Sequence, residues 1–172
     1  VTFTVGHDGT TNGAASLNGT NQYISFANDT AVDYSKNLTL SLWFKRTSAN
    51  LFGKTLISKG YHNEFELSFT EKLCFYHGTT STSHYWKYEG PDTSMFQENV
   101  WYNLSVVRKG NDKTWLVSFY VNGHLTHETN GESSENYLSS YGSSYTNFDS
   151  TVYNIPQTST HKIFIGAQNN NP

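Results

Sequence analysis

The most regular alternation of apolar and polar residues in this chain lies between residues 101 and 128. Two arms there place an apolar side chain at every second position, and the segment Lys109 to Lys113 between them holds the glycine, asparagine and aspartate that a turn needs. The apolar positions of the two arms are Tyr102, Leu104, Val106, Val117, Phe119 and Val121. Because side chains alternate between the faces of a strand, this pattern predicts an antiparallel hairpin with one buried face. A second turn, Asn122-Gly123, predicts that another strand follows at once.

Shorter runs with the same period of two predict further strands. They lie at residues 1–5, 23–26, 38–46, 56–60, 65–69, 73–75 and 161–167. In the run 38–46 the leucines point one way and Trp43 points the other, so we expect both faces of that strand to be covered, as in the centre of a sheet. No long segment carries apolar residues at helical spacing. The pattern predicts an all-β fold, built as a two-sheet antiparallel sandwich.

Composition agrees with this fold class and narrows the function. The chain has 172 residues, which suits one domain over 1–172, and its 12 Tyr, 11 Phe and 4 Trp favour strands. The net charge of −3 argues against nucleic acid as a partner, because phosphate binding needs a basic patch. No apolar run approaches the roughly 18 residues of a membrane span. The one cysteine, Cys74, lies in a strand-like run and is predicted to be a small buried apolar residue.

The order of the apolar segments resembles a known family. The chain reads AASLNGTNQYISF, LTLSLWFKR, LISKG, FELSF, LCFY, WYNLSVVRKG, FYVNGHL and IFIGA in succession, over most of residues 14–167. This order is similar to that of the laminin G-like jelly roll of the concanavalin A-like superfamily. The resemblance implies two curved antiparallel sheets, with ligand contacts on the concave face or on rim loops. It also implies a secreted or cell-surface protein that binds glycans, proteins or cell surfaces, in some members with calcium, while a smaller number of members are glycosidases.

The ends of the chain depart from this family pattern. The family usually has a strand before the region that matches residues 1–18, and another strand after the one that matches IFIGA, whereas this chain ends in Asn-Asn-Asn-Pro. We therefore expect a fragment of a larger extracellular protein. The closing strand is expected from a neighbouring domain, from another chain or from the N-terminal VTFTV, because an open sheet edge invites aggregation.

Two segments without a clean burial pattern carry the candidate binding residues. Residues 77–93 read as a long loop or an irregular hairpin, and residues 130–160 are rich in serine and tyrosine. Aromatic rings stack on sugar rings, and tyrosine with serine and asparagine is typical of recognition loops. The predicted ligand-binding residues are His84, Tyr85, Trp86, Tyr88, Tyr137, Tyr141 and Tyr145. The alternative is that these aromatic side chains fold back and cap the sandwich.

The sequence gives less support to catalytic or metal-binding residues than to the aromatic binding residues. Glu64 and Glu66 have the alternation of a glycosidase carboxylate pair, but no third acidic residue follows, and two solvated strand residues explain them more simply. Oxygen ligands for calcium are offered in predicted loops by Asp8, Asn28, Asp29 and Asp33, which are otherwise ordinary turn residues.

The sequence therefore predicts a non-catalytic module rather than an enzyme. The favoured ligand is a glycan or a cell-surface glycoprotein, bound with or without calcium, and a protein or peptide comes next. The alternative is a structural module that a neighbouring domain or chain completes.

Overall fold

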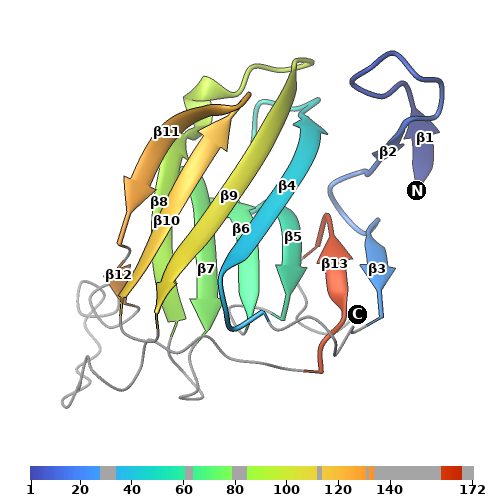
Figure 1. Ribbon diagram of the computed structural model, residues 1–172. Helices are drawn as coiled ribbons and strands as arrows, with labels where there is room; N and C mark the ends of the chain where they lie inside the picture. The colour runs from blue at the N-terminus through green and yellow to red at the C-terminus, as the bar shows by residue number, and fades with distance from the viewer. Residues whose placement is uncertain are drawn as a thin grey trace.

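The computed structural model describes residues 1–27, 34–60, 64–78, 85–111, 114–130, 132–133 and 160–167 of the chain. Its strands form three antiparallel sheets, of which the two larger ones face each other (Figure 1). The orders are β12-β8-β7-β6-β5-β13-β3 in the seven-stranded sheet, β11-β10-β9-β4 in the four-stranded sheet and β1-β2 in the N-terminal pair. The strands are β1 (Thr2–Thr4), β2 (Ala14–Ser16), β3 (Ile24–Phe26), β4 (Leu38–Lys45), β5 (Thr55–Lys59), β6 (Phe65–Phe69), β7 (Lys72–Gly78), β8 (Tyr85–Asp92), β9 (Trp101–Asn111), β10 (Thr114–Val121), β11 (His124–Thr129), β12 (Glu132–Ser133) and β13 (Ile163–Ile165), with one 3-10 turn at Thr93–Met95.

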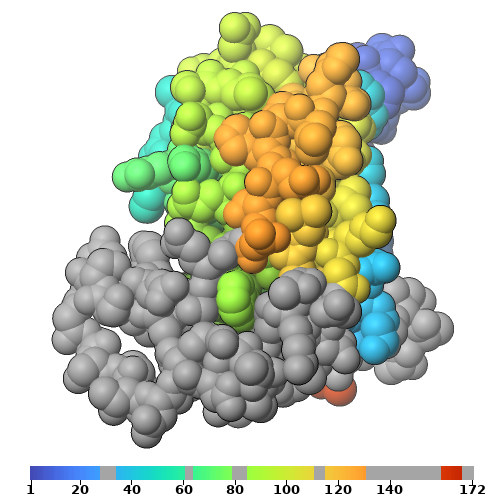
Figure 2. All heavy atoms as spheres, turned by 60° about the vertical axis from the view of Figure 1, so that its left-hand side comes forward, coloured from blue at the N-terminus to red at the C-terminus, as the bar shows by residue number. Residues whose placement is uncertain are grey.

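The hairpin that the alternation predicted is the centre of the four-stranded sheet. Strands β9 and β10 pair antiparallel with Val106 opposite Phe119, and both side chains are buried. The following turn has positive φ at both Asn122 (50°) and Gly123 (80°), as a two-residue hairpin turn of type I′ requires. It leads into β11, which packs beside β8 at the edge of the two sheets (Figure 2). The predicted hairpin and its second turn are confirmed.

Apolar side chains from both large sheets interlock between them. An aromatic cluster at one end joins Phe44 of β4 to Phe96 and Tyr102, with ring centroids 5.3 Å apart between Phe44 and Phe96 and between Phe96 and Tyr102. The Tyr102 hydroxyl donates to the Met95 carbonyl (3.2 Å) and accepts from the Gln97 amide (2.9 Å), so its polar end is satisfied. The predicted all-β, two-sheet antiparallel jelly-roll sandwich is confirmed.

A buried arginine holds the segment that precedes β4 against the core. The guanidinium of Arg108 donates to the backbone carbonyls of Tyr34 and Lys36, the latter at 2.7 Å. It also lies 4.9 Å from the ring centroid of Trp115 and is fully buried. Arginine suits this position because its planar group donates in several directions while stacking on a ring.

Three expectations need correction. Residues 85–92 form strand β8, paired with β7, rather than part of a long loop, so the irregular-hairpin alternative for residues 77–93 is the right one. Trp43 is 45% exposed, because β4 pairs only with β9 among the described residues and its outer face looks to solvent. The VTFTV segment pairs with β2 in a separate two-stranded sheet and does not complete either large sheet.

The four-stranded sheet is narrower than the sheet it faces. Strand β4 ends it, whereas β13 and β3 continue the other sheet further, beyond β5 (Figure 1). The register places Phe26 beside Ile163, Ile163 beside Lys59, and Lys59 beside Phe65 of the core, so these side chains share the inner face. Phe26 is nevertheless 50% exposed, which shows that this part of the inner face is incompletely covered.

Candidate functional site

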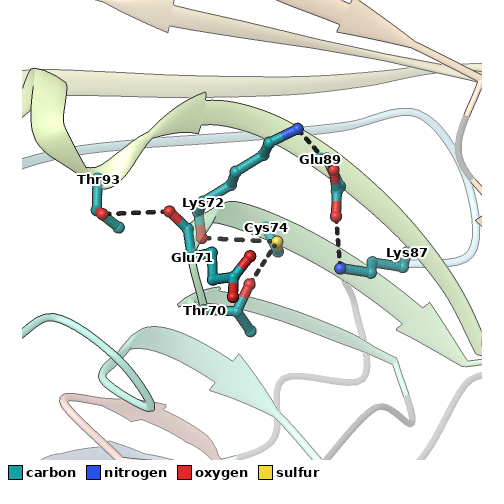
Figure 3. A network of polar contacts seen from close by, with 7 residues as sticks. All are labelled: Thr70, Glu71, Lys72, Cys74, Lys87, Glu89 and Thr93. Carbon is teal, nitrogen blue, oxygen red and sulfur yellow. Dashed lines mark hydrogen bonds and ion pairs between the residues drawn. The ribbon is translucent and has the colours of Figure 1, made fainter.

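A charged cluster lies on the outer face of the seven-stranded sheet, away from the sandwich core. Strand β7 supplies Lys72, and β8 supplies Lys87 and Glu89 (Figure 3). One carboxylate oxygen of Glu89, Oε2, accepts from Lys72 Nζ at 2.8 Å, and Oε1 accepts from Lys87 Nζ at 2.6 Å. The side chains of Lys72 and Glu89 are 39% and 43% exposed, so the cluster can be reached from solvent.

The two ammonium groups set the charge state of this carboxylate. Hydrogen bonds from Lys72 and Lys87 hold the pKa of Glu89 below its ordinary value, although partial burial opposes them. The hydrogen bond that Lys72 donates to Glu89 in turn raises the pKa of Lys72. At neutral pH the cluster therefore presents an ionised acceptor flanked by two ionised donors.

Two tyrosines continue the same face of the sheet. Tyr85, Lys87 and Glu89 alternate along β8 and so point to one side, and the Tyr85 ring packs edge-on against Tyr76 of β7, with centroids 5.7 Å apart. Tyr76 is buried, and this burial raises the pKa of its phenol, whereas Tyr85 is half-buried. Tyr85 is thus the ring that borders the charged cluster with surface still open to solvent.

The outer face is closed on the other side of this cluster. Other outer-face residues of β5, β6 and β7 are each at most 3% exposed, namely Ser58, Glu66, Ser68 and Cys74. The accessible polar part of the face is therefore narrow and lies toward β8. We refer to Lys72, Tyr85, Lys87 and Glu89 as the β7–β8 patch.

The predicted binding residues fall in different places. Tyr85 belongs to the β7–β8 patch. Trp86 points the other way, half-buried against the core, because it alternates with Tyr85 and Lys87. Tyr88 is fully buried, with its ring centroid 5.2 Å from that of His77. The structure thus leaves Tyr88 no surface for a ligand, and burial raises the pKa of its phenol. His84, Tyr137, Tyr141 and Tyr145 lie outside the described residues.

Glu64 and Glu66 are not the solvated strand residues that the sequence suggested. Both are buried, at 1% and 0% exposure. The Glu64 carboxylate forms an ion pair with Lys59, whose ammonium lies 4.4 Å from the ring centroid of Tyr34 in the core. The Glu66 carboxylate accepts from the Thr55 hydroxyl at 3.4 Å. Neither carboxylate is presented to solvent.

The calcium candidates gain no support from the described part of the chain. Asp8 accepts a hydrogen bond from the Thr10 amide at 2.9 Å, the contact of an Asx turn, and this bond is the main cause that lowers its pKa. Asn28, Asp29 and Asp33 lie outside the described residues. Within those residues, no group of three or more His, Cys, Asp or Glu side chains is arranged to hold a metal ion.

Sequence reasoning missed a second cluster, on the outer face of the four-stranded sheet. The His7 ring stacks on Trp43 with centroids 4.0 Å apart and meets Trp101 edge-on at 6.4 Å. A signal was present, because Trp43 is out of phase with the leucines of the same strand. This phase predicts a second covered face, whereas the structure leaves Trp43 45% exposed.

Comparison with known proteins places this fold in a family. A laminin G-type model of the concanavalin A-like lectin/glucanases superfamily matches residues 18–152, well over half of the chain. A search of curated proteins gave no match. Laminin G-like domains are typically extracellular. No helix in the described residues is long and apolar enough to span a membrane. The chain belongs to the concanavalin A-like lectin/glucanase superfamily, as a laminin G-like jelly roll.

Proposed function

We propose that this protein is a non-catalytic carbohydrate-binding module of an extracellular or cell-surface protein. The observation that carries the proposal is the β7–β8 patch, in which the ionised Glu89 stands between two ammonium groups on the same face as the half-buried ring of Tyr85. Sugar hydroxyl groups donate to a carboxylate and accept from an ammonium group. These charge-assisted hydrogen bonds are stronger than hydrogen bonds between neutral groups. The C–H face of a pyranose ring packs on an aromatic ring such as that of Tyr85. The patch therefore offers the two kinds of contact that a sugar needs.

The proposed module is non-catalytic. This part of the proposal is supported by the burial of Glu64 and Glu66, the carboxylate pair that the sequence offered for catalysis. Glycoside hydrolysis needs two carboxyl groups on either side of the scissile bond. Glu64 is held by Lys59, and both Glu64 and Glu66 are buried, so a glycosidic bond has no access to them in this structure. An incubation of the protein with the glycans it binds tests this point. Hydrolysis that disappears in Glu64→Gln or Glu66→Gln would overturn it.

A glycan array tests the binding function. The wild-type chain is expected to bind a restricted set of glycans, with or without calcium. Tyr85→Ala is expected to lose most of that signal, because it removes the stacking ring. Leu125→Ala is the matched control, since it removes an apolar side chain that is 54% exposed on the other sheet. Circular dichroism on each variant separates loss of binding from loss of fold. An array without bound glycans, or a Tyr85→Ala signal equal to that of wild type, would contradict the proposal.

A second candidate function is an assembly module that another chain completes. The observation in its favour is the end of the four-stranded sheet, where β4 pairs only with β9 among the described residues and Phe26 on the inner face is 50% exposed. A strand added beside β4 would pair with its edge and cover this apolar surface. Light scattering over a range of protein concentrations tests this. A concentration-dependent dimer that Phe26→Lys abolishes supports assembly, and a monomer at every concentration contradicts assembly between copies of this chain.

A further inference from the structure

We propose that the outer face of the four-stranded sheet carries a second saccharide site, centred on Trp43 and selective for acidic sugars. It lies on the opposite sheet from the β7–β8 patch and shares no residue with it. The proposal does not rest on the function assigned to that patch. We refer to His7, Trp43, Lys45 and Trp101 as the Trp43 surface.

The ring of Trp43 is exposed to a degree that is unusual for tryptophan. It keeps 45% of its surface open although the His7 ring stacks on it at 4.0 Å, with 26° between the ring planes. Tryptophan is rarely left open to solvent without a reason, because it carries the largest apolar surface of any side chain. A second tryptophan, Trp101, borders the same stack through its edge contact with His7. The His7–Trp43 stack and the neighbouring Trp101 therefore form an exposed aromatic platform, which the C–H groups of a sugar ring can contact.

Hydrogen-bonding groups surround the platform. The register of β4 and β9 sets Trp43 opposite Asn103 and Ser41 opposite Ser105, all on the outer face because they alternate with buried residues. The hydroxyl groups of Ser41 and Ser105 lie 2.9 Å apart. An aromatic ring flanked by an amide and two hydroxyl groups suits a ligand that is apolar on one face and rich in hydroxyl groups at its edge. A purely apolar partner would leave these polar groups without water.

The charges at the Trp43 surface favour an anionic sugar. The ammonium of Lys45 lies 5.0 Å from the ring centroid of Trp101, its neighbour across the strands. The carboxylate next to His7 in the sequence, that of Asp8, is turned into its own loop, where it accepts from the Thr10 amide. A uronate carboxylate or a sulfate ester on the stacked sugar would meet Lys45 first, and a charge-assisted hydrogen bond would hold it.

The competing explanation is purely structural. His7 lies between β1 and β2, so its stack on Trp43 also ties the N-terminal hairpin, which stands beside the sandwich in Figure 1, to the four-stranded sheet. If this were the whole role of Trp43, no saccharide would bind there. His7→Ala and Trp43→Ala would then speed proteolytic cleavage of the hairpin and do nothing else.

Calorimetric titration with a trimer of galacturonic acid and with the neutral maltotriose tests the proposal. Wild type is expected to bind the acidic trimer more tightly than the neutral one. Trp43→Ala is expected to weaken acidic-trimer binding by roughly tenfold or more, as removal of a central aromatic contact does. Lys45→Gln is expected to remove the preference for the acidic trimer, and Leu125→Ala on the same sheet is expected to change nothing.

Two further comparisons make the outcome decisive. Glu89→Gln alters only the β7–β8 patch, so acidic-trimer binding that survives in Glu89→Gln and is lost in Trp43→Ala belongs to the Trp43 surface, and failure of one site is distinguishable from failure of the other. A Trp43→Ala variant that is folded by circular dichroism and binds like wild type would overturn the site. Absence of binding of either trimer to wild type would also overturn it, and equal affinity for the two trimers would overturn its acidic selectivity.

Discussion

Lys87 and Glu89 stand two residues apart on β8, so their side chains leave the same face of the strand, and Lys87 Nζ lies 2.6 Å from Glu89 Oε1. The second oxygen of the same carboxylate is 2.8 Å from Lys72 Nζ on β7. The Glu89 carboxylate thus joins a contact along one strand to a contact between neighbouring strands. This arrangement both orders the patch and fixes its charge.

Stability should depend on the ionisation of Glu89. The folded protein holds the pKa of Glu89 below its ordinary value of 4.5, so the unfolded chain takes up the proton more readily. The contribution of the ion cluster is therefore complete above about pH 5 and is lost as the pH falls through the lowered folded-state pKa. Because these groups are partly exposed and screened by water, we expect the cluster to contribute at most about 1 kcal/mol to the free energy of unfolding. Urea unfolding of wild type and Glu89→Gln between about pH 3 and pH 6 measures the difference.

The control for this experiment is Glu98→Gln, which removes an exposed carboxylate in the turn before β9. Its unfolding midpoint should follow that of wild type across the same pH range. The difference in free energy of unfolding between wild type and Glu89→Gln should shrink as the solution is acidified. A difference that stays constant would show that the cluster does not stabilise the fold through its charge.

Replacement of Arg108 should lower the free energy of unfolding more than replacement of an exposed residue does. Arg108→Met keeps much of the volume and the apolar packing against Trp115, but it removes the donor to the buried Tyr34 carbonyl and to the partly buried Lys36 carbonyl. We expect a loss of about 2–4 kcal/mol in the free energy of unfolding. The neighbouring exposed Lys109 provides the control, since Lys109→Met should stay within about 0.5 kcal/mol of wild type. Equal stability of the two variants would contradict the conclusion that Arg108 holds the segment before β4 against the core.

The thiol of Cys74 should be inert in the folded protein. The side chain is fully buried, and burial raises the pKa of the thiol, so little reactive thiolate exists near neutral pH. The Thr70 hydroxyl, 3.3 Å from Sγ, covers it further (Figure 3). A thiol reagent that produces a coloured product should react with the native chain roughly a hundredfold more slowly than with the chain in urea. Rapid labelling of one thiol per chain under native conditions would contradict this placement.

Most of the strands that the sequence predicted have one predominantly apolar face. In β9 and β10 the apolar positions recur with period two while the alternate positions are polar, so the pattern identifies both the strand and its buried side. The sequence left strand β8 undecided between a loop and an irregular hairpin, because both of its faces carry aromatic residues and because Gly90-Pro91 resembles a turn. The structure gives Gly90 a different role, since a Cβ there would lie 2.7 Å from the Phe119 ring.

The site was less predictable than the fold. Lys72 and Glu89 are far apart in the sequence, and only the pairing of β7 with β8 brings them together, which local periodicity does not reveal. Arg108 did carry a signal, because it is in phase with the buried Leu104 and Val106, but its partners lie more than 70 residues away. The sequence therefore identified Tyr85 as a binding candidate without the charged groups beside it.

Carbohydrate binding by the β7–β8 patch predicts a loss of affinity when the Glu89 carboxylate is removed. Calorimetric titration of the glycan that gives the strongest array signal, against wild type, Glu89→Gln and the control Glu98→Gln, tests it most directly. Wild type and Glu98→Gln should bind with equal affinity, and Glu89→Gln should bind roughly tenfold or more weakly, because it removes a charge-assisted acceptor. Equal affinity of folded Glu89→Gln and wild type would contradict the claim.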